Sequence, residues 1–570
     1  MGMETIETDV LIIGAGVAGI MAALRAQESR VEVLVVTKGP FGRDGAASWM
    51  AGWGLQVAHY PPDSLETHVR ETIRAGQYLN NQKLVSNLVS VMPECLDRFD
   101  KWGVRYLKKD GKIASKRIPG TKHLRVPIYE REGRAGGVDY RRVLPHQVRL
   151  RGIKALSDLM ITDLLKTDNT VVGAVGLDIR EGNFVAIKAK TTILATGGCM
   201  GIYRFSATSP TLVGDGYAMA LRAGVELSGM EFADFYVSTA CWPPLLRGEL
   251  DAITDLRFDL AGKIFNKRGD EFLERHKGSA IAYPITVQKE IEELRGSPHG
   301  GVYLSFNHLP RNIIADYIEE CGGQRWITLF KDAGIDLYEG AIEVAPAPME
   351  SMGGCKINER CQTSLTNLFA TGEVAYGAEG AYTMAGNPMA LHTAGGFIAG
   401  EEAAAKARGI KTVTVDEKQL QELRGKIFKP LSQESGVKFL KVKRETEELL
   451  EKYFPMTGKT KALIEKGLDE IARLRQEVLP QVFSGVKTTR FNLEWVESLE
   501  APNRVDTMEM FFRCALMREE SRGLHSRKDY PHTDPAWLKN VVLQKTGDEM
   551  KTWTEPVELT FFQPEEAQKR

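Results

Sequence analysis

The sequence of 570 residues predicts an α/β fold that carries an inserted α+β domain and a C-terminal helical domain. A βαβ pattern with a glycine-rich turn opens the chain, and the same α/β rhythm returns after a long interruption. Charged amphipathic helices then dominate from about residue 415. Hydrophobic residues make up 43% and charged residues 26%, which is the balance of a globular chain with a large core. The length corresponds to about three to four structural units.

The first 36 residues contain a nucleotide-binding pattern. Asp9–Ile13 and Val31–Val36 are apolar runs typical of buried parallel strands, and a glycine-rich turn followed by a helical stretch connects them. Gly14 permits the tight turn, Gly16 lets the backbone approach a pyrophosphate, and Gly19 lets the helix pack closely on the strand. The helix N-terminus then offers N–H groups to phosphate oxygens. These residues predict a Rossmann-like unit that binds a dinucleotide.

The domains follow from changes in this pattern along the chain. Helical periodicity runs from Ser64 to Gly103, with Gly103 as a C-cap, and a further helix is predicted from Tyr217 to Ala223. Strands are predicted at residues 171–177, 184–189, 191–195 and 365–370, and a strand-like piece at 557–561. We therefore predict a first part of the nucleotide-binding domain at 1–235, a capping domain at 236–340, a return segment at 341–414, a C-terminal helical domain at 415–545 and a tail at 546–570.

Composition excludes several classes of protein. The 74 basic and 75 acidic residues give a net charge of −1, which argues against a protein that neutralises nucleic-acid phosphates. The N-terminus lacks a secretory pattern, and no run of about 18 apolar residues predicts a membrane span. Seven cysteines without a C-x-x-C pair predict neither a disulfide framework nor a metal cluster within this chain. We expect a cytoplasmic protein without a metal site.

Motifs spread along the chain resemble a known family. They are the opening glycine turn, Ala195-Thr196-Gly197-Gly198, Gly214-Asp215-Gly216, Met230-Glu231-Phe232, Thr371-Gly372-Glu373, and Arg518-Glu519-Glu520-Ser521-Arg522-Gly523 with Leu524-His525 and Asp529-Tyr530-Pro531. In this order they resemble the flavoprotein subunits of fumarate reductase and succinate dehydrogenase. Related families are L-aspartate oxidase and the alpha subunit of adenylylsulfate reductase. The resemblance covers about residues 7 to 545, and residues 172–195 are most similar to the adenylylsulfate reductase branch.

The resemblance implies FAD as the cofactor. It places the pyrophosphate on the first turn, the adenosine ribose by Thr37 and Lys38, and the pyrimidine edge of the flavin at a helix N-terminus. A family histidine that binds FAD covalently is absent from Ala47-Ser48-Trp49, so we expect non-covalent FAD. The implied cofactor-binding residues are Gly14, Gly16, Ala18, Gly19, Thr37, Lys38, Gly39, Gly45, Ala46, Ser48, Gly52, Gly54, Ala195, Thr196, Gly197, Asp215, Glu373, Asn387, Pro388 and Met389.

The residues that bind a dicarboxylate in that family are replaced in this chain. Two family histidines correspond to Tyr236 and Met349, and the family arginine corresponds to Thr383. Without these charge-assisted donors both carboxylates would be poorly held, so fumarate and succinate are not the expected substrates. Arg257 corresponds to a catalytic arginine of the family, although the spacing differs by about one residue. The predicted catalytic residues are Arg257, Tyr236 and His392, and Tyr382 and Glu350 are weaker candidates.

Two kinds of function remain open from the sequence. The first is an FAD-dependent oxidoreductase in which a small-molecule substrate reacts under the cap and electrons pass to or from a separate iron–sulfur subunit. The second is an electron-relay or scaffold subunit of a larger redox complex, whose substrate pocket has decayed. Tyr236, Tyr382, Trp49 and Trp53 are large replacements that favour the enzyme. Saturable reoxidation of the reduced protein by a small molecule would distinguish the two.

Overall fold

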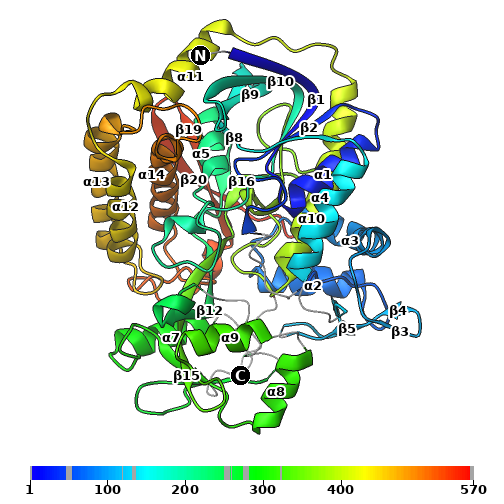
Figure 1. The fold of residues 1–570 in the computed structure, drawn as a ribbon, viewed down its shortest axis with the longest axis vertical. Coiled ribbons are helices and arrows are strands. Elements are labelled where there is room, and N and C mark those ends of the chain that lie inside the picture. The colour runs from blue at the N-terminus through cyan, green and yellow to red at the C-terminus, as the bar shows by residue number, and fades with distance from the viewer. Residues whose placement is uncertain are drawn as a thin grey trace.

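A seven-stranded sheet forms the centre of the molecule (Figure 1). The computed structural model describes residues 3–46, 54–118, 120–130, 136–248, 257, 260–273, 282–320 and 324–564. The sheet has the order β7-β2-β1-β10-β9-β8, and β17 pairs with β10. Its strands are β1 (Met3–Ile13), β2 (Val33–Val36), β7 (Lys154–Leu156), β8 (Leu159–Thr167), β9 (Thr170–Asp178), β10 (Asn183–Leu194) and β17 (Leu368–Ala370). The predicted strands at 184–189 and 191–195 are one continuous strand, because β10 pairs with the whole length of β1.

Helices of the nucleotide-binding domain cover the sheet. On the side of β1, α1 (Val17–Gln27) packs against α10 (Asn387–Arg408), which in turn packs against α3 (Gln82–Trp102). The predicted C-cap Gly103 has a φ of 98°, a left-handed conformation that glycine adopts without strain. On the side of β8 lies α5 (Asp215–Ala223). The helices α2 (Leu65–Ala75) and α4 (Gly136–Leu150) complete this part.

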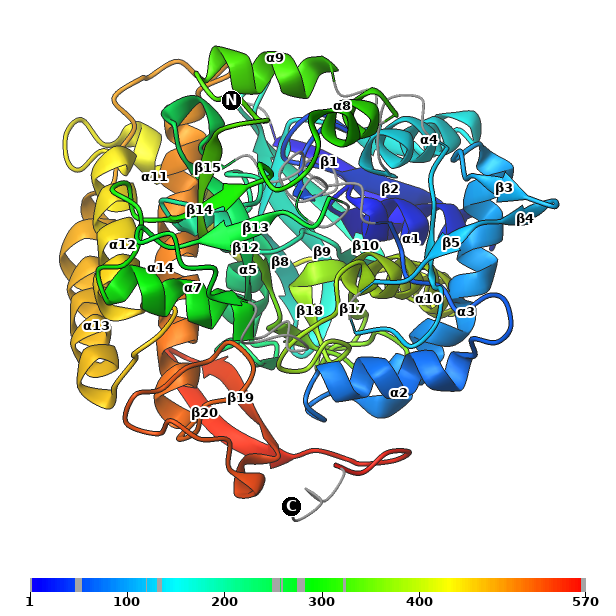
Figure 2. The same ribbon diagram turned by 90° about the horizontal axis from the view of Figure 1, so that it is seen from below.

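The cap is a four-stranded antiparallel sheet with helices around it, at the bottom of Figure 1 and nearest the viewer in Figure 2. Its strands have the order β12-β15-β14-β13. They are β12 (Ala233–Trp242), β13 (Lys263–Phe265), β14 (Val302–Ser305) and β15 (Ala341–Ser351), and the helices are α7 (Ala282–Glu292), α8 (Arg311–Glu320) and α9 (Gln324–Asp332). This sheet extends past both ends of the predicted segment 236–340. The cap has its own apolar core, which spans Val237 to Val344.

Long helices of the C-terminal domain lie along one flank of the molecule, in yellow and orange in Figure 1. They are α11 (Glu417–Ser432), α12 (Phe439–Tyr453), α13 (Lys461–Arg473) and α14 (Leu493–Met517). The hairpin of β19 (Lys539–Thr546) and β20 (Glu549–Pro556) follows and joins the short strands β11 (Leu227–Ser228), β16 (Gly354–Lys356) and β18 (Ala375–Tyr376) in a second sheet. The strand-like prediction at 557–561 is wrong, because the hairpin ends at Pro556 and residues 557–561 pair with no strand of the described chain.

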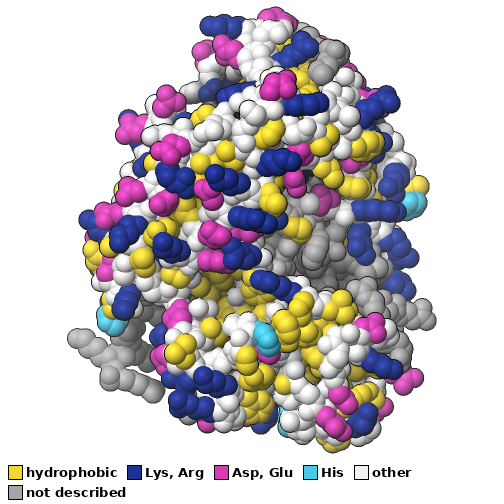
Figure 3. All heavy atoms as spheres, turned by 60° about the vertical axis from the view of Figure 1, so that its left-hand side comes forward, with side chains coloured by type: hydrophobic (Ala, Val, Ile, Leu, Met, Phe, Trp, Pro, Cys, Tyr) yellow, Lys and Arg dark blue, Asp and Glu magenta, His cyan; other side chains and the backbone are white. Residues whose placement is uncertain are grey.

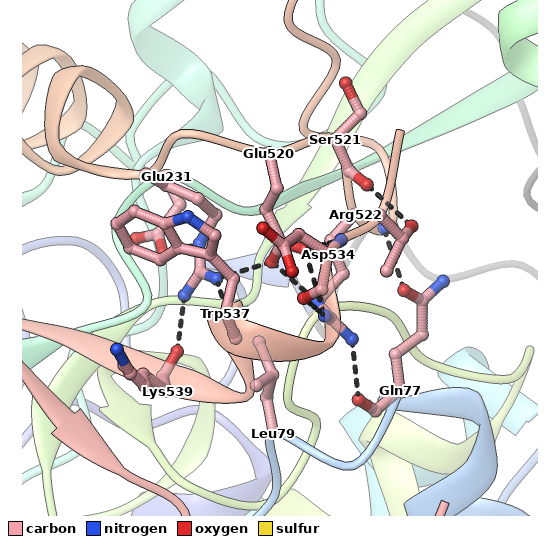
Figure 4. Close-up of polar contacts among 12 residues, drawn as sticks. Gln77, Leu79, Glu231, Glu520, Ser521, Arg522, Asp534, Trp537 and Lys539 are labelled. Atoms are coloured by element: carbon pink, nitrogen blue, oxygen red, sulfur yellow. Dashed lines mark hydrogen bonds and ion pairs between the residues drawn. The ribbon is translucent and has the colours of Figure 1, made fainter. Parts of the chain in front are cut away.

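A buried network of charges holds the segment after α14 against the nucleotide-binding domain (Figure 4). The Arg518 guanidinium donates to Glu231 at 2.7 Å and to Glu520 at 2.8 Å. Arg522 donates twice to Glu520, at 2.6 and 2.9 Å, and the Asp534 N–H donates to the same carboxylate at 2.9 Å. The Arg518 and Glu520 side chains are fully buried, so these ion pairs are hardly screened by solvent.

The surface carries both signs of charge. Figure 3 shows basic and acidic side chains interspersed over the upper part of the face that it draws, and hydrophobic side chains gathered on the lower lobe, which is the cap. None of the helices in the described parts of the chain combines the length and the apolar run needed to cross a bilayer.

Candidate functional site

A long cavity begins at the glycine-rich turn and ends at the cap. It contains about 270 Å³ of space in which the centre of a water molecule can lie. Residues of the turn between β1 and α1 line one part of it, and Tyr236 of β12 and Met349 of β15 line another. The N-terminus of α10 contributes Gly386, Pro388 and Met389. The cavity therefore lies between the nucleotide-binding domain and the cap.

The cavity brings together most of the predicted site residues. Those that line it are Gly14, Gly16, Ala18, Thr37, Lys38, Gly45, Ala46, Ala195, Thr196, Gly197, Asp215, Tyr236, Glu373, Pro388, Met389 and His392. Five others lie outside its lining: Gly19, Gly39, Gly54, Arg257 and Asn387. The predicted residues Ser48 and Gly52, the stretch Ala47-Ser48-Trp49 and Trp53 fall outside the described residues.

The glycine turn is built for close approach. A Cβ added at Gly19 would lie 2.1 Å from the Gly14 carbonyl oxygen, so Gly19 lets α1 pack on the turn. A Cβ added at Gly16 would meet no protein atom within 4 Å, although Gly16 lines the cavity at the N-cap of α1. The space in front of Gly16 therefore suits a ligand and not a protein side chain. This arrangement fits the pyrophosphate of a dinucleotide.

Lys38 links three segments beside this turn. Its Nζ lies 2.7 Å from an Asp215 carboxylate oxygen, 2.7 Å from Glu500 of α14, and donates to the Thr211 carbonyl oxygen at 2.9 Å. Burial alone would lower the pKa of Lys38, but the two carboxylates raise it above its usual range, so the ammonium stays charged. The Asp215 carboxylate also accepts a hydrogen bond from Asn503 of α14 at 2.8 Å. The helical domain thus helps to fix one wall of the cavity.

The N-terminus of α10 is positioned from behind by buried polar groups. The Asn387 amide donates to the Thr72 hydroxyl at 3.2 Å, and its carbonyl oxygen accepts from His68 Nε2 at 2.9 Å. Burial and the charge of Arg125 lower the pKa of His68 to about 3, against the opposing effect of Asp63, so its ring is neutral. Asp63 itself forms a bidentate ion pair with Arg125, at 2.8 and 2.9 Å. Asn387 therefore supports the cavity wall without lining it.

The cap end of the cavity is acidic. It contains Glu350 of β15, which is 7% exposed, and His392 of α10. Glu379, which is 3% exposed, does not line the cavity but lies 3.2 Å from His392 Nε2. Burial raises the pKa of Glu350 well above its usual range, and Glu379, Glu373 and Asp234 add to this rise. Burial raises the pKa of Asp234 to about 7. Burial would lower the pKa of His392, but Glu379 raises it overall.

Glu379 is a member of the site that the sequence did not predict. The only signal in the sequence is a single carboxylate inside a glycine-rich apolar run, residues 377–391, where most neighbours have no charge. A role for Glu379 can be inferred only from the fold, which buries its carboxylate and places Glu350 and His392 beside it.

Arg257 is buried rather than solvated. Its side chain is 7% exposed, and its guanidinium carbon lies 5.8 Å from the centre of the Tyr283 ring in the cap. Burial lowers its pKa to about 10, against the effects of Tyr236 and Tyr283, so Arg257 remains a cation at neutral pH. Arg257 does not line the cavity, but it interacts electrostatically with Tyr236, which does.

Comparison with known proteins gives the family of this chain. A model described as "FAD binding domain" matches residues 9–389, and one described as "Fumarate reductase flavoprotein C-term" matches residues 443–569. The chain is also 32% identical over 562 residues to one subunit of the CoM/CoB fumarate reductase of Methanothermobacter marburgensis, covering 96% of this chain and 98% of that protein. The chain belongs to the fumarate reductase flavoprotein family. Its cofactor is FAD and it is an FAD-dependent oxidoreductase.

Solved structures of this family share the fold. Sdh1 of Mycobacterium smegmatis is 27% identical, with a TM-score of 0.87 over 98% of this chain and 96% of that one. Adenylylsulfate reductase of Archaeoglobus fulgidus is 23% identical, with a TM-score of 0.79 over 98% of each chain, and at this identity the likeness shows the fold alone. The predicted fold class of an FAD-binding domain with a cap and a C-terminal helical domain is confirmed.

Proposed function

We propose that this chain is the flavoprotein subunit of a two-electron oxidoreductase that acts on a small molecule other than fumarate or succinate. FAD would be held by the glycine turn, by the walls that contain Thr37, Lys38 and Asp215, and by the N-terminus of α10. When bound, FAD supplies exchange of two electrons with a substrate or with one-electron carriers. The chain's own residues orient the substrate between the cap and α10, and exclude water from it.

The chemistry of the cap end of the cavity supports the substrate part of this proposal most directly. Tyr236, Met349 and Thr383 stand where the resemblance places the two histidines and the arginine of a dicarboxylate site. Among the described residues that line the cavity at this end, His392 is the only basic side chain, and Glu379 and Glu350 lie 3.2 and 3.5 Å from its Nε2. A planar dianion needs paired cationic donors, and it would meet carboxylates here instead.

Tyr236 is the residue that we propose to act on the substrate, with Arg257 acting through it. The Tyr236 side chain lines the cavity, and buried Arg257 provides positive charge from the cap side. A phenol backed by a cation can donate a hydrogen bond or a proton to a substrate atom that gains negative charge. Arg257 is therefore proposed as a positioning residue that acts through Tyr236, and His392 as a residue that borders the substrate.

An iron–sulfur subunit is the proposed electron-transfer partner. Support comes from the Methanothermobacter relative, which is named as one subunit of an enzyme, and from the cysteines of this chain, none of which forms a C-x-x-C pair. We expect FAD to be bound non-covalently, because the sequence has no histidine at residues 47–49.

One experiment tests the proposal as a whole. The protein is purified anaerobically from its native source with its partners, reduced, and mixed with fumarate while the flavin absorbance near 450 nm is followed. We expect an iron–sulfur protein to copurify, acid precipitation to release the flavin, and fumarate to leave the reduced flavin unchanged. Rapid, saturable reoxidation by fumarate would refute the substrate proposal, and flavin retained in the acid pellet would refute non-covalent binding.

The alternative is a subunit that relays electrons without a substrate of its own. It predicts that no small molecule reoxidises the reduced flavin saturably, whereas the enzyme requires one that does. Glu350 and Glu379 each have a buried oxygen atom without a hydrogen-bond partner, which favours the enzyme, because a decayed pocket has no reason to retain such groups.

A further inference from the structure

Three side chains with metal-binding atoms meet at the cap end of the cavity. Glu350 comes from β15, Glu379 from the loop between β18 and α10, and His392 from the second turn of α10. His392 Nε2 lies 3.2 Å from Glu379 Oε1 and 3.5 Å from Glu350 Oε1, and all three atoms lie within 4.8 Å of one another. Segments distant in the sequence are thus folded so that one nitrogen and two oxygen atoms converge.

None of these three atoms has a hydrogen-bond partner in the described chain. Glu350 Oε1, Glu379 Oε1 and His392 Nε2 are all buried and unsatisfied, although the two carboxylates lie near the ring nitrogen. Neither glutamate forms an ion pair with a lysine or arginine of the part of the chain that the structure describes. A buried carboxyl oxygen atom without a hydrogen-bond partner is costly, so a ligand that binds both oxygen atoms would stabilise the site.

A further carboxyl group adds to the negative charge. Asp234 of β12 lies directly opposite Glu350 of β15 in the antiparallel ladder, and both are more than nine-tenths buried. Acidic side chains directly opposite one another in a ladder repel. A bound metal cation would relieve this repulsion by displacing the proton that burial otherwise favours there.

The two separations that involve His392 match those between ligands of a transition-metal ion. Oxygen and nitrogen ligands bind Zn²⁺ at roughly 2.0–2.2 Å, which places tetrahedral neighbours about 3.3–3.6 Å apart. The 3.2 and 3.5 Å from His392 Nε2 to the two oxygen atoms agree with this, and none of the three atoms has a satisfied hydrogen bond. From this geometry we infer that Glu350, Glu379 and His392 bind a divalent metal ion, of the kind that accepts carboxylate and imidazole ligands, such as Zn²⁺ or Mn²⁺.

The ion would keep a coordination position open toward the cavity. Glu350 and His392 line the cavity, and three protein ligands leave a fourth position for water or for a substrate oxygen or nitrogen atom. Two ionised glutamates and a divalent ion have no net charge together. The metal therefore does not restore the positive charge of a dicarboxylate site, and the inference is compatible with the proposed function without depending on it.

Binding of the metal alone tests this inference. The purified flavoprotein is dialysed against a chelator and then titrated with Mn²⁺, observed through the EPR signal of the free ion, and with Zn²⁺ by calorimetry. Mn²⁺ is informative because it avoids thiolates, so binding at the cysteines is separated from binding at this site. We expect one equivalent of at least one of the two ions to bind, in a step that needs neither substrate nor turnover.

Variants assign the binding to these residues. Glu379→Gln and His392→Asn are each expected to weaken binding at least about 10-fold, since even outer-shell partners of metal sites have effects of that size. Glu343→Gln is the matched control, because Glu343 lies on the same strand and also pairs with a histidine, His299, at 2.8 Å in the cap. Flavin content and circular dichroism verify folding, and Glu350→Gln replaces any variant that fails to fold. Absence of a stoichiometric site for both ions, or binding unchanged in both Glu379→Gln and His392→Asn, would overturn the inference.

Discussion

Replacement of Glu520 by glutamine removes the charge at the centre of the network in Figure 4 and keeps the side-chain shape. The Glu520 carboxylate accepts four hydrogen bonds, of which one comes from Arg518, two from Arg522 and one from the Asp534 N–H. In Glu520→Gln an NH2 group replaces one carboxylate oxygen atom, so a hydrogen-bond donor faces the donors that the carboxylate accepted from. Glu231 then remains as the carboxylate partner of Arg518, and Arg522 loses the carboxylate that it binds in this network. Removing one partner of a buried ion pair costs about 3–5 kcal/mol.

Thermal unfolding of the holoprotein measures this effect. For a cooperative unit of 150–250 residues, about 3–5 kcal/mol corresponds to a fall of roughly 6–20 °C in the unfolding midpoint. Glu519→Gln is the control, because it makes the same substitution at the neighbouring position, which is exposed. It is expected to change the free energy of unfolding by no more than about 0.5 kcal/mol. If both variants unfolded at the same temperature, the network would not contribute to stability as argued.

Three other predictions concern the cavity walls. His68 is neutral in the folded protein, where its pKa is about 3, and its pKa is 6.5 when unfolded. Between pH 6.5 and pH 5 only the unfolded state takes up the proton, so the free energy of unfolding should fall by about 2 kcal/mol by pH 5 relative to its value well above pH 6.5. Urea unfolding at both pH values should show a smaller loss in His68→Gln. Lys38→Met leaves the carboxylates of Asp215 and Glu500 without their cation and should lower the free energy of unfolding by about 1–3 kcal/mol, since the Lys38 side chain is only 19% exposed. Lys188→Met, which removes a surface ion pair, is the control and should lower it by less than about 1 kcal/mol in the same assay. Gly16→Ala should leave the stability of the apoprotein unchanged but lower its affinity for FAD at least about 10-fold in a fluorescence titration. Gly19→Ala should destabilise the apoprotein itself, because its new Cβ meets the Gly14 carbonyl oxygen. Equal effects of the two variants on apoprotein stability would contradict the assigned roles.

The nucleotide-binding half could be predicted from the sequence because its signals are local. The run Asp9–Ile13, the glycine turn and the following helix occupy about 20 consecutive residues, and their spacing alone specifies a βαβ unit. The same holds for the C-cap Gly103, which the structure confirms with its positive φ. By contrast, the sequence predicts two strands where β10 is one, because the mostly polar residues 188–192 resemble a break until pairing with β1 is known.

The cap end of the cavity could be predicted only in part. The replacements at Tyr236 and Met349 were visible by comparison with family motifs, and both line the cavity. The cluster around His392 was not visible, because its members come from residues 350, 379 and 392 and become neighbours only when β15, the loop after β18 and α10 come together in the fold. Spacing along a sequence carries no information about side chains that tertiary contacts bring together.

A two-stranded ribbon joins the cap to the rest of the chain, and this ribbon is suited to act as a hinge. The chain enters the cap along β12 and leaves along β15, and the pairing of these strands is irregular at three places, the middle one between Tyr236 and Thr239. On one side of that interruption lie Tyr236 and the cavity; on the other begins the separate apolar core of the cap. Such irregularities are where a ribbon bends most readily. Rotation of the cap about this point would move Tyr236 little and the rest of the cap far, so that the site could open to solvent while its own wall stays in place.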